Sequence, residues 1–92
     1  MKQKTAEVAD LLKTMAHPER LMVLCQLVEG ELGVTQLQVE SSLSQSAFSQ
    51  QLSVLRSNGL VKIRKESQQV FYSLADPRIK DLIANLHRIF CD

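Results

Sequence analysis

Residues 43–74 read LSQSAFSQQLSVLRSNGLVKIRKESQQVFYSL, and the spacing of the apolar residues changes halfway along this stretch. In the first half, Phe48, Leu52 and Leu55 recur at the i, i+4, i+7 spacing of an amphipathic helix. Ser44 precedes this run and is a favourable N-cap, because its hydroxyl can accept a hydrogen bond from the first helical turn. The pattern predicts a helix with one apolar face that packs into a core.

The second half of the stretch predicts a β-hairpin. Gly59 suits the position just after the end of the preceding helix. From residue 60 onward, apolar and polar residues alternate in two runs, which is the period of two typical of half-buried strands. The tip of the hairpin is expected near residues 65–68.

Three more helices are expected before this stretch and one after it. Their expected positions are residues 5–16, Pro18 to near Gly30, 34–41, and a last helix with Asp76 as N-cap and Pro77 in its first turn. The order is therefore α-α-α-α-β-β-α. A short helix, a tight turn, a polar-faced helix and a basic hairpin predict a mainly α fold, the winged helix-turn-helix.

Length and composition limit the class of protein. The 92 residues are 45% hydrophobic and 23% charged, as in a globular protein, and we expect one domain over residues 1–92. A chain of this size has a marginal core, so an oligomer would help. No apolar run approaches the roughly 18 residues of a membrane span, and the first residues lack a signal-peptide pattern. We therefore expect a cytoplasmic protein with no membrane partner.

The outward face of the helix over residues 43–56 predicts contact with double-stranded DNA. It carries short, polar, uncharged side chains, namely Gln45, Ser46, Ser49, Gln50 and Ser53. Such a face suits a major groove, because serine hydroxyls reach phosphates and base edges while glutamine can pair with adenine. By itself, the same pattern also fits a solvated helix surface.

The distribution of charge supports the DNA interpretation. Residues 41–65 contain four basic residues and no acid, whereas residues 6–40 contain six acids against two bases. The four basic residues are Arg56, Lys62, Arg64 and Lys65. We expect them to flank a duplex and to contact its phosphates.

The two cysteines, Cys25 and Cys91, lie 66 positions apart on separate predicted helices. Structural disulfides are rare in the cytoplasm, so these thiols are either small hydrophobic core residues or reactive groups. Leu21, Leu24, Cys25 and Val28 share one predicted face, which places Cys25 in the core. Cys91 is expected near a frayed helix end.

Three segments of the chain resemble one known family. They are AHPERLMVLCQLVEGELGVTQL (16–37), LSQSAFSQQLSVLRSNGLVKIRK (43–65) and VFYSL (70–74), which resemble the ArsR/SmtB family of bacterial winged-helix repressors. The run L-S-Q-S-x-x-S-Q-x-L-x-x-L-R-x-x-G-L-V over residues 43–61 is specific. The resemblance extends from about Ala9 to Cys91.

The resemblance implies a symmetric homodimer built on the first and last helices. It also implies a recognition helix at residues 45–57, with Gln45, Ser46, Ser49, Gln50 and Gln51 at the family's DNA-contact positions. Two departures from the family pattern concern the operator sequence and the wing contacts rather than the fold. Many members have His where this chain has Gln51, and the hairpin tip has Ser67 and Gln68 instead of Gly and Arg.

The metal sites usual in this family are incomplete here. Gly33 and Thr35 stand where one type of member has a thiol pair, and the last helix contains only His87 with scattered acids. We expect no metal site and no cofactor. A metal-responsive repressor that uses Cys25, Cys91 and His87 is the alternative, because thiolate and imidazole can hold zinc or a softer ion.

The cysteine pattern resembles the dithiol, sulfur- and redox-sensing branch of the family, the BigR, SqrR and HlyU type. The matching segments are VLCQL around Cys25 and RIFC ending at Cys91. This resemblance implies repression from an inverted-repeat operator in the reduced state. It implies release when a persulfide or another oxidant links the two cysteines by a disulfide or polysulfide.

Cys91 is expected to attack the oxidant first, with Cys25 as the resolving thiol. Arg88 and His87 lie close to Cys91, and cationic neighbours with solvent access favour a reactive thiolate. A further alternative is an activator that displaces a silencing protein from DNA. An enzyme is not expected, because the sequence has no paired carboxylates, Cys-His-acid set or glycine-rich phosphate loop.

Overall fold

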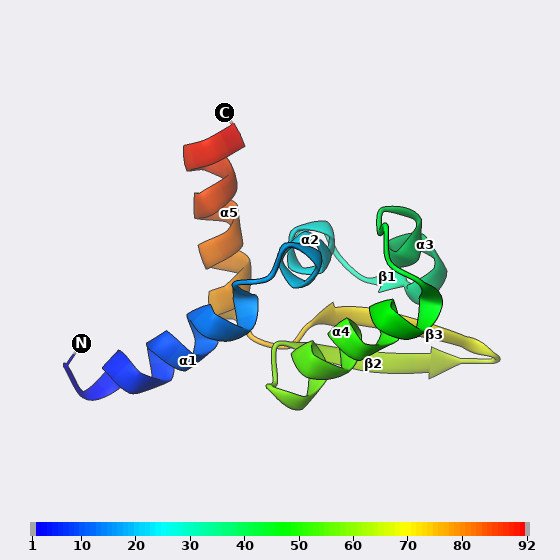
Figure 1. Cartoon of the computed structure of the whole chain (residues 1–92), viewed down its shortest axis with the longest axis horizontal. Coiled ribbons are helices and arrows are strands. Elements are labelled where there is room, and N and C mark those ends of the chain that lie inside the picture. The colour runs from blue at the N-terminus through cyan, green and yellow to red at the C-terminus, as the bar shows by residue number, and fades with distance from the viewer. Residues whose placement is uncertain (1, 92) are drawn as a thin grey trace.

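Four α-helices precede the β-hairpin and one follows it, in the order that the sequence predicts (Figure 1). The computed structural model describes residues 2–91. The elements are a 3₁₀ turn at Lys2–Lys4, α1 (Thr5–Met15), α2 (Pro18–Leu27), β1 (Leu32–Gly33), α3 (Val34–Val39), α4 (Gln45–Ser57), β2 (Val61–Glu66), β3 (Gln69–Leu74) and α5 (Pro77–Cys91). Helices α3 and α4 are the helix-turn-helix, and β2 with β3 forms the wing.

Local side chains fix where the helices begin. The Ser44 hydroxyl accepts a hydrogen bond from the backbone N–H of Ala47 at 3.2 Å, so it caps α4 as predicted. His17 caps α2 through its Nδ1 atom, which accepts from the N–H of Glu19 at 3.1 Å. At α5, a carboxylate oxygen of Asp76 accepts from the N–H of Arg78 at 2.9 Å. Capping therefore confirms three predicted helix starts.

The sheet has three antiparallel strands in the order β1-β3-β2. The hairpin register runs from the pair Val61–Leu74 to the pair Glu66–Gln69, and the turn lies at residues 67–68. Strand β1 pairs Leu32 with Tyr72 at the far edge of β3. The sequence did not indicate β1, because two residues are too few to show a period of two.

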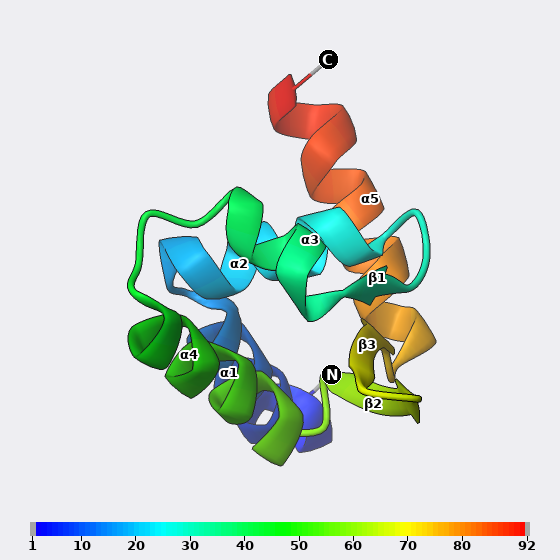
Figure 2. The same cartoon turned by 90° about the vertical axis from the view of Figure 1, so that its right-hand side faces the viewer.

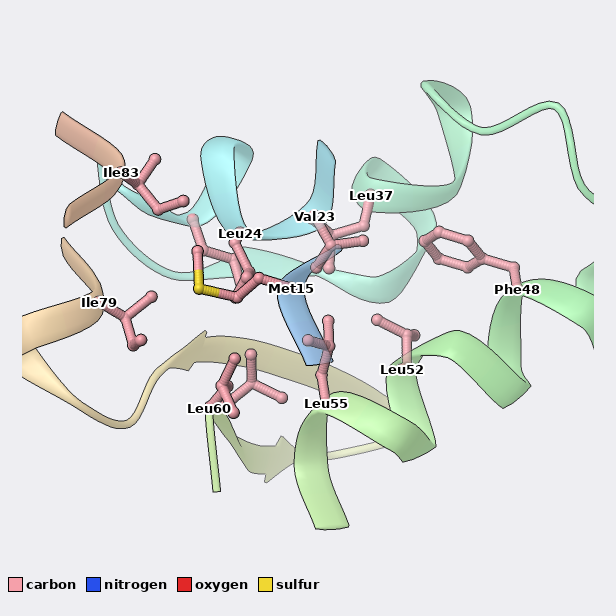
Figure 3. Packing of buried hydrophobic residues seen from close by; sticks show 12 residues of the cluster. Met15, Val23, Leu24, Leu37, Phe48, Leu52, Leu55, Leu60, Ile79 and Ile83 are labelled. Atoms are coloured by element: carbon pink, nitrogen blue, oxygen red, sulfur yellow. The ribbon is translucent and has the colours of Figure 1, made fainter. Parts of the chain in front are cut away.

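The hydrophobic core lies where α2, α3, α4, the sheet and the start of α5 meet (Figure 3). Its members are Met15, Val23, Leu24, Leu27, Leu37, Phe48, Leu52, Leu55, Leu60, Val61, Ile79 and Ile83. The predicted apolar face of α4 is thus confirmed. Because this face is fully buried, the opposite face of α4 must point outward, and the core determines its orientation.

The predicted core face of α2 is wrong for two of its four members. Leu24 is buried and Val28 is half-buried, but Leu21 and Cys25 are exposed. The actual core face contains Val23, Leu24 and Leu27. Residues 21–28 are apolar at nearly every position, so their spacing does not define one face; packing against α4 and α5 decides it.

Large apolar side chains are exposed on four helices of the described part of the chain, among them Met22 of α2 and Val39 of α3, and α1 and α5 carry the rest besides Leu21. The second half of α5 projects away from the rest of the chain in both views (Figures 1 and 2). Its Ile89 and Phe90 are 59% and 78% exposed, and Leu12 of α1 is 48% exposed. Within residues 2–91, no helix is both long enough and apolar enough to cross a membrane.

Candidate DNA-binding face and thiol groove

The outward face of α4 is polar and open to solvent. Gln45, Ser46, Ser49, Gln50 and Ser53 are all exposed. Together with Gln51 and Val54 they line one open concavity on the surface. The structure thus brings the predicted helix residues onto a single face, and this face carries no charged side chain.

Gln51 differs from its neighbours on α4 because its side chain is already engaged. Its Oε1 atom accepts a hydrogen bond from Nη1 of Arg20 at 3.0 Å, and Gln51 itself is half-buried. The Nε atom of Arg20 also donates to the backbone carbonyl of Thr14 at 2.6 Å. The sequence did not indicate this role for Arg20, because it depends on contacts between α1, α2 and α4.

The basic residues near the wing fall into two groups. Arg56, Lys62 and Lys65 are exposed, and none of them forms an ion pair within residues 2–91. Their charges are therefore available to a polyanion.

Arg64 is held by other side chains instead. Its guanidinium donates to both carboxylate oxygens of Glu31, at 2.8 and 3.0 Å, and to Glu66 at 2.7 Å. It also lies over the ring of Phe71, 4.7 Å from the centroid. The hydrogen bonds from Arg64 lower the pKa of Glu31 and raise the pKa of Arg64. Two carboxylates offset its positive charge, and Glu31, just before β1, becomes tied to the wing.

The two cysteines line the same groove, although they come from α2 and α5. This groove has mostly apolar walls and is lined by Leu21, Cys25, Ile83, Leu86, His87, Phe90 and Cys91. Both thiols are free and exposed. Partial burial raises the pKa of Cys25, and the nearby Cys91 thiol raises it further. The structure therefore corrects the expectation that Cys25 lies in the core: it lies at the surface, in reach of solvent.

The residues of the alternative metal site share a groove but do not form a metal cluster. His87 lines the same groove as the two cysteines. Nowhere in residues 2–91 do three or more His, Cys, Asp or Glu side chains gather closely enough to hold a metal ion.

Comparisons with known proteins support one family. The model of the family described as "Bacterial regulatory protein, arsR family" matches residues 17–62, which run from α2 into β2. The biofilm growth-associated repressor of Xylella fastidiosa is 45% identical over 91 residues, covering 99% of this chain and 80% of that protein. The transcriptional activator HlyU of Vibrio cholerae is 47% identical over 91 residues, covering 99% of this chain and 84% of that protein.

Solved structures agree with the sequence comparison. The structure of HlyU from Vibrio cholerae matches with a TM-score of 0.93 and 47% identity, covering 100% of both chains. The structure of the transcriptional repressor BigR from Xylella fastidiosa matches with a TM-score of 0.92 and 44% identity, covering 100% of this chain and 94% of the other. Regulators of this family bind operator DNA and act as dimers. The chain therefore belongs to the arsR family of bacterial regulatory proteins, and it is a winged helix-turn-helix regulator of transcription rather than an enzyme.

Proposed function

We propose that this chain is a thiol-controlled repressor that binds an inverted-repeat operator when reduced and releases it when Cys25 and Cys91 are linked. The observation that carries the proposal is that these two thiols, from α2 and α5, line one apolar groove. Its place of action is the bacterial cytoplasm, where free thiols are kept reduced.

The DNA contacts would come from α4 and the wing. The polar residues of α4 enter the major groove, namely Gln45, Ser46, Ser49, Gln50, Gln51 and Ser53. Arg56, Lys62 and Lys65 bind phosphates, because their charges are exposed and unpaired within the described part of the chain. Arg64, also predicted to contact DNA, would act mainly by holding the wing against Glu31.

The active species would be a homodimer of this one domain, with contacts from α1 and α5. Ile89, Phe90 and Leu12 are apolar and exposed, and burying them in a partner would add the core area that 92 residues lack. Each protomer then presents one α4 to one half of an inverted repeat.

The chemistry of the switch can be written with a persulfide, RSSH, as the oxidant. The Cys91 thiolate attacks the outer sulfur, which forms a Cys91 persulfide and releases the thiol RSH. The Cys25 thiolate then attacks the inner sulfur, forming a Cys25–Cys91 disulfide and releasing hydrogen sulfide. A second RSSH can first extend the Cys91 persulfide by one sulfur, releasing a second RSH; attack of the Cys25 thiolate on the middle sulfur then forms a trisulfide link and releases hydrogen sulfide. The raised pKa of Cys25 suits the later, resolving step, because less thiolate is present to react with the oxidant directly.

A link between Cys25 and Cys91 would fix α5 against α2. Because α5 is a proposed dimer helix, such a link would change how the two α4 helices are presented to DNA. A loss of about 3 kcal/mol in operator binding would lower the affinity more than a hundredfold. A small change in dimer geometry is enough for that loss, because both half-sites must be engaged at a fixed spacing.

Gel shifts with an inverted-repeat operator test the proposal. Persulfide treatment should abolish the shift of the wild-type protein, and dithiothreitol should restore it. The variants Cys25→Ser and Cys91→Ser should bind the operator and keep binding after treatment. A normal response of either variant would refute the dithiol switch, because each variant can form only one half of the link.

One alternative function has specific support. HlyU of Vibrio cholerae is named an activator, so this chain could activate transcription by displacing a silencing protein. Promoter activity in a deletion strain distinguishes a repressor from an activator. Loss of a repressor raises promoter activity, whereas loss of an activator lowers promoter activity.

A further inference from the structure

The first turn of α2 holds the helix-turn-helix at two points through side chains, at the turn between its helices and at the middle of α4. Glu19 accepts a hydrogen bond from the hydroxyl of Ser41 at 2.7 Å, and that hydroxyl accepts from the N–H of Leu43 at 3.0 Å. These two bonds fix the turn between α3 and α4. Arg20, the next residue on α2, binds Gln51 in the middle of α4. Adjacent residues of one helix therefore reach the turn before the recognition helix and the centre of that helix.

Arg20 connects three helices at once. Its Nε atom donates to the Thr14 carbonyl in the last turn of α1, and Nη1 donates to Gln51 of α4. A guanidinium can do this because its donors point in fixed, divergent directions, which a lysine ammonium cannot reproduce. Arg20 is half-buried and pairs with no carboxylate in residues 2–91, so it acts through these two oriented hydrogen bonds rather than through an ion pair.

We infer that Arg20 is a positioning residue for DNA binding, which sets the orientation of α4 through Gln51 without touching DNA itself. The inference rests on the proposed DNA-binding function of α4. Gln51 then has two roles. It lines the concavity of the DNA-facing side, and its amide oxygen accepts the hydrogen bond from Arg20.

The position of Arg20 on α2 gives this hydrogen bond a second consequence. Cys25 lies five residues further along the same helix, so one continuous run of α2 joins the two residues. Any change that a Cys25–Cys91 link imposes on α2 reaches α4 through Arg20 and Glu19. Removing the hydrogen bond from Arg20 to Gln51 should therefore weaken operator binding in the reduced protein and reduce the further effect of linking the thiols.

The test compares Arg20→Lys, Gln51→Met and the double variant by operator affinity at several salt concentrations. We expect each single variant to bind about tenfold more weakly, and the double variant to bind no more weakly than the weaker single one, because both remove one interaction. Independent effects that multiply to about a hundredfold would overturn the inference.

The salt dependence distinguishes positioning from direct binding of phosphate. A variant that binds one phosphate fewer has a slope of log affinity against log salt that is shallower by about 0.9, so Lys62→Ala should reduce the slope. Arg20→Ala should leave it unchanged, and a reduced slope would show that Arg20 binds phosphate and contradict the inference. Wild-type protein that binds no operator would instead refute the proposed function.

A fold control completes the design. Thermal unfolding of Arg20→Lys should remain cooperative, because the lysine keeps the charge and most of the apolar stem. Should Arg20→Ala unfold, the cycle with Arg20→Lys and Gln51→Met still decides the inference. As an independent measure, persulfide treatment should change the operator affinity of Arg20→Lys by a smaller factor than that of the wild type; an equal factor would contradict the transmission through Arg20.

Discussion

The two ends of α2 differ in how they are held. At its start, Glu19 and Arg20 make hydrogen bonds to the helix-turn-helix and to the end of α1. Towards its end, Cys25 lies in an apolar groove beside α5. One end is fixed by oriented polar bonds, and the other is open to reagents. One helix therefore joins the DNA-facing unit, which it holds by hydrogen bonds, to a site where a covalent bond can still form.

The same contrast appears in the burial of neighbouring residues on α2. Leu24 is fully buried, whereas Cys25 is exposed. The variant Leu24→Ala should lower the free energy of unfolding by about 2–5 kcal/mol, because it leaves a cavity in the core. Cys25→Ala should change it by less than about 1 kcal/mol. Denaturant unfolding at equal protein concentration measures both free energies. Equal losses for the two variants would contradict the finding that Leu24 is buried and Cys25 is exposed.

A charge placed on the DNA-facing side of α4 should greatly weaken operator binding while leaving the fold intact. Ser49→Glu puts a carboxylate in the middle of the exposed face of α4. We predict at least about a hundredfold loss of operator affinity, since the charge would face phosphates and base edges. Ser49→Ala is the matched control and should lose less than about tenfold. Similar affinities for the two variants would mean that this face does not enter DNA.

Within the DNA-facing side, the wing residues should separate into phosphate-binding and positioning groups. Lys62→Ala or Lys65→Ala should each reduce the salt slope of operator binding by about 0.9, because each variant binds one phosphate fewer. Arg64→Ala should leave the slope nearly unchanged, because Glu31 and Glu66 already offset its charge. Binding measured by fluorescence anisotropy over a range of salt tests this, and an equal drop for all three would refute the distinction.

At the open end of α2, the smallest expected effect is on thiol reactivity. Because burial raises the pKa of Cys25, its thiolate fraction at neutral pH is lower than that of an ordinary cysteine. In a Cys91→Ser variant, the rate of alkylation by iodoacetamide should reach half its maximum at a pH above the value found for the same chain in denaturant. A midpoint at or below the denatured value would contradict the effect of burial.

Most of the fold could be predicted from the sequence, because its signals are local. Ser44 and Asp76 mark helix starts, and the change of period after Gly59 marks the hairpin. The polar face of α4 could be predicted because it lies opposite the buried residues Phe48, Leu52 and Leu55. Residues 21–28 are apolar at nearly every position and gave no such signal, so only the structure shows the packing that exposes Cys25.

The candidate site could be predicted only in part, for a similar reason. The resemblance to a dithiol branch selected Cys25 and Cys91, and the structure places both on one groove. The roles of Arg20 and Glu31 depend on partners 31 and 33 positions away along the chain. No periodic pattern or motif in the sequence connects such residues.

The operator affinity of purified, linked protein tests the central proposal most directly. Protein treated with persulfide would be separated from the reduced form, and mass spectrometry would confirm the Cys25–Cys91 link and count its sulfur atoms. Affinities of both forms for the same inverted repeat would then be measured at one salt concentration. We predict binding at least about a hundredfold weaker for the linked form, restored by dithiothreitol. Equal affinities of linked and reduced protein would contradict the thiol switch.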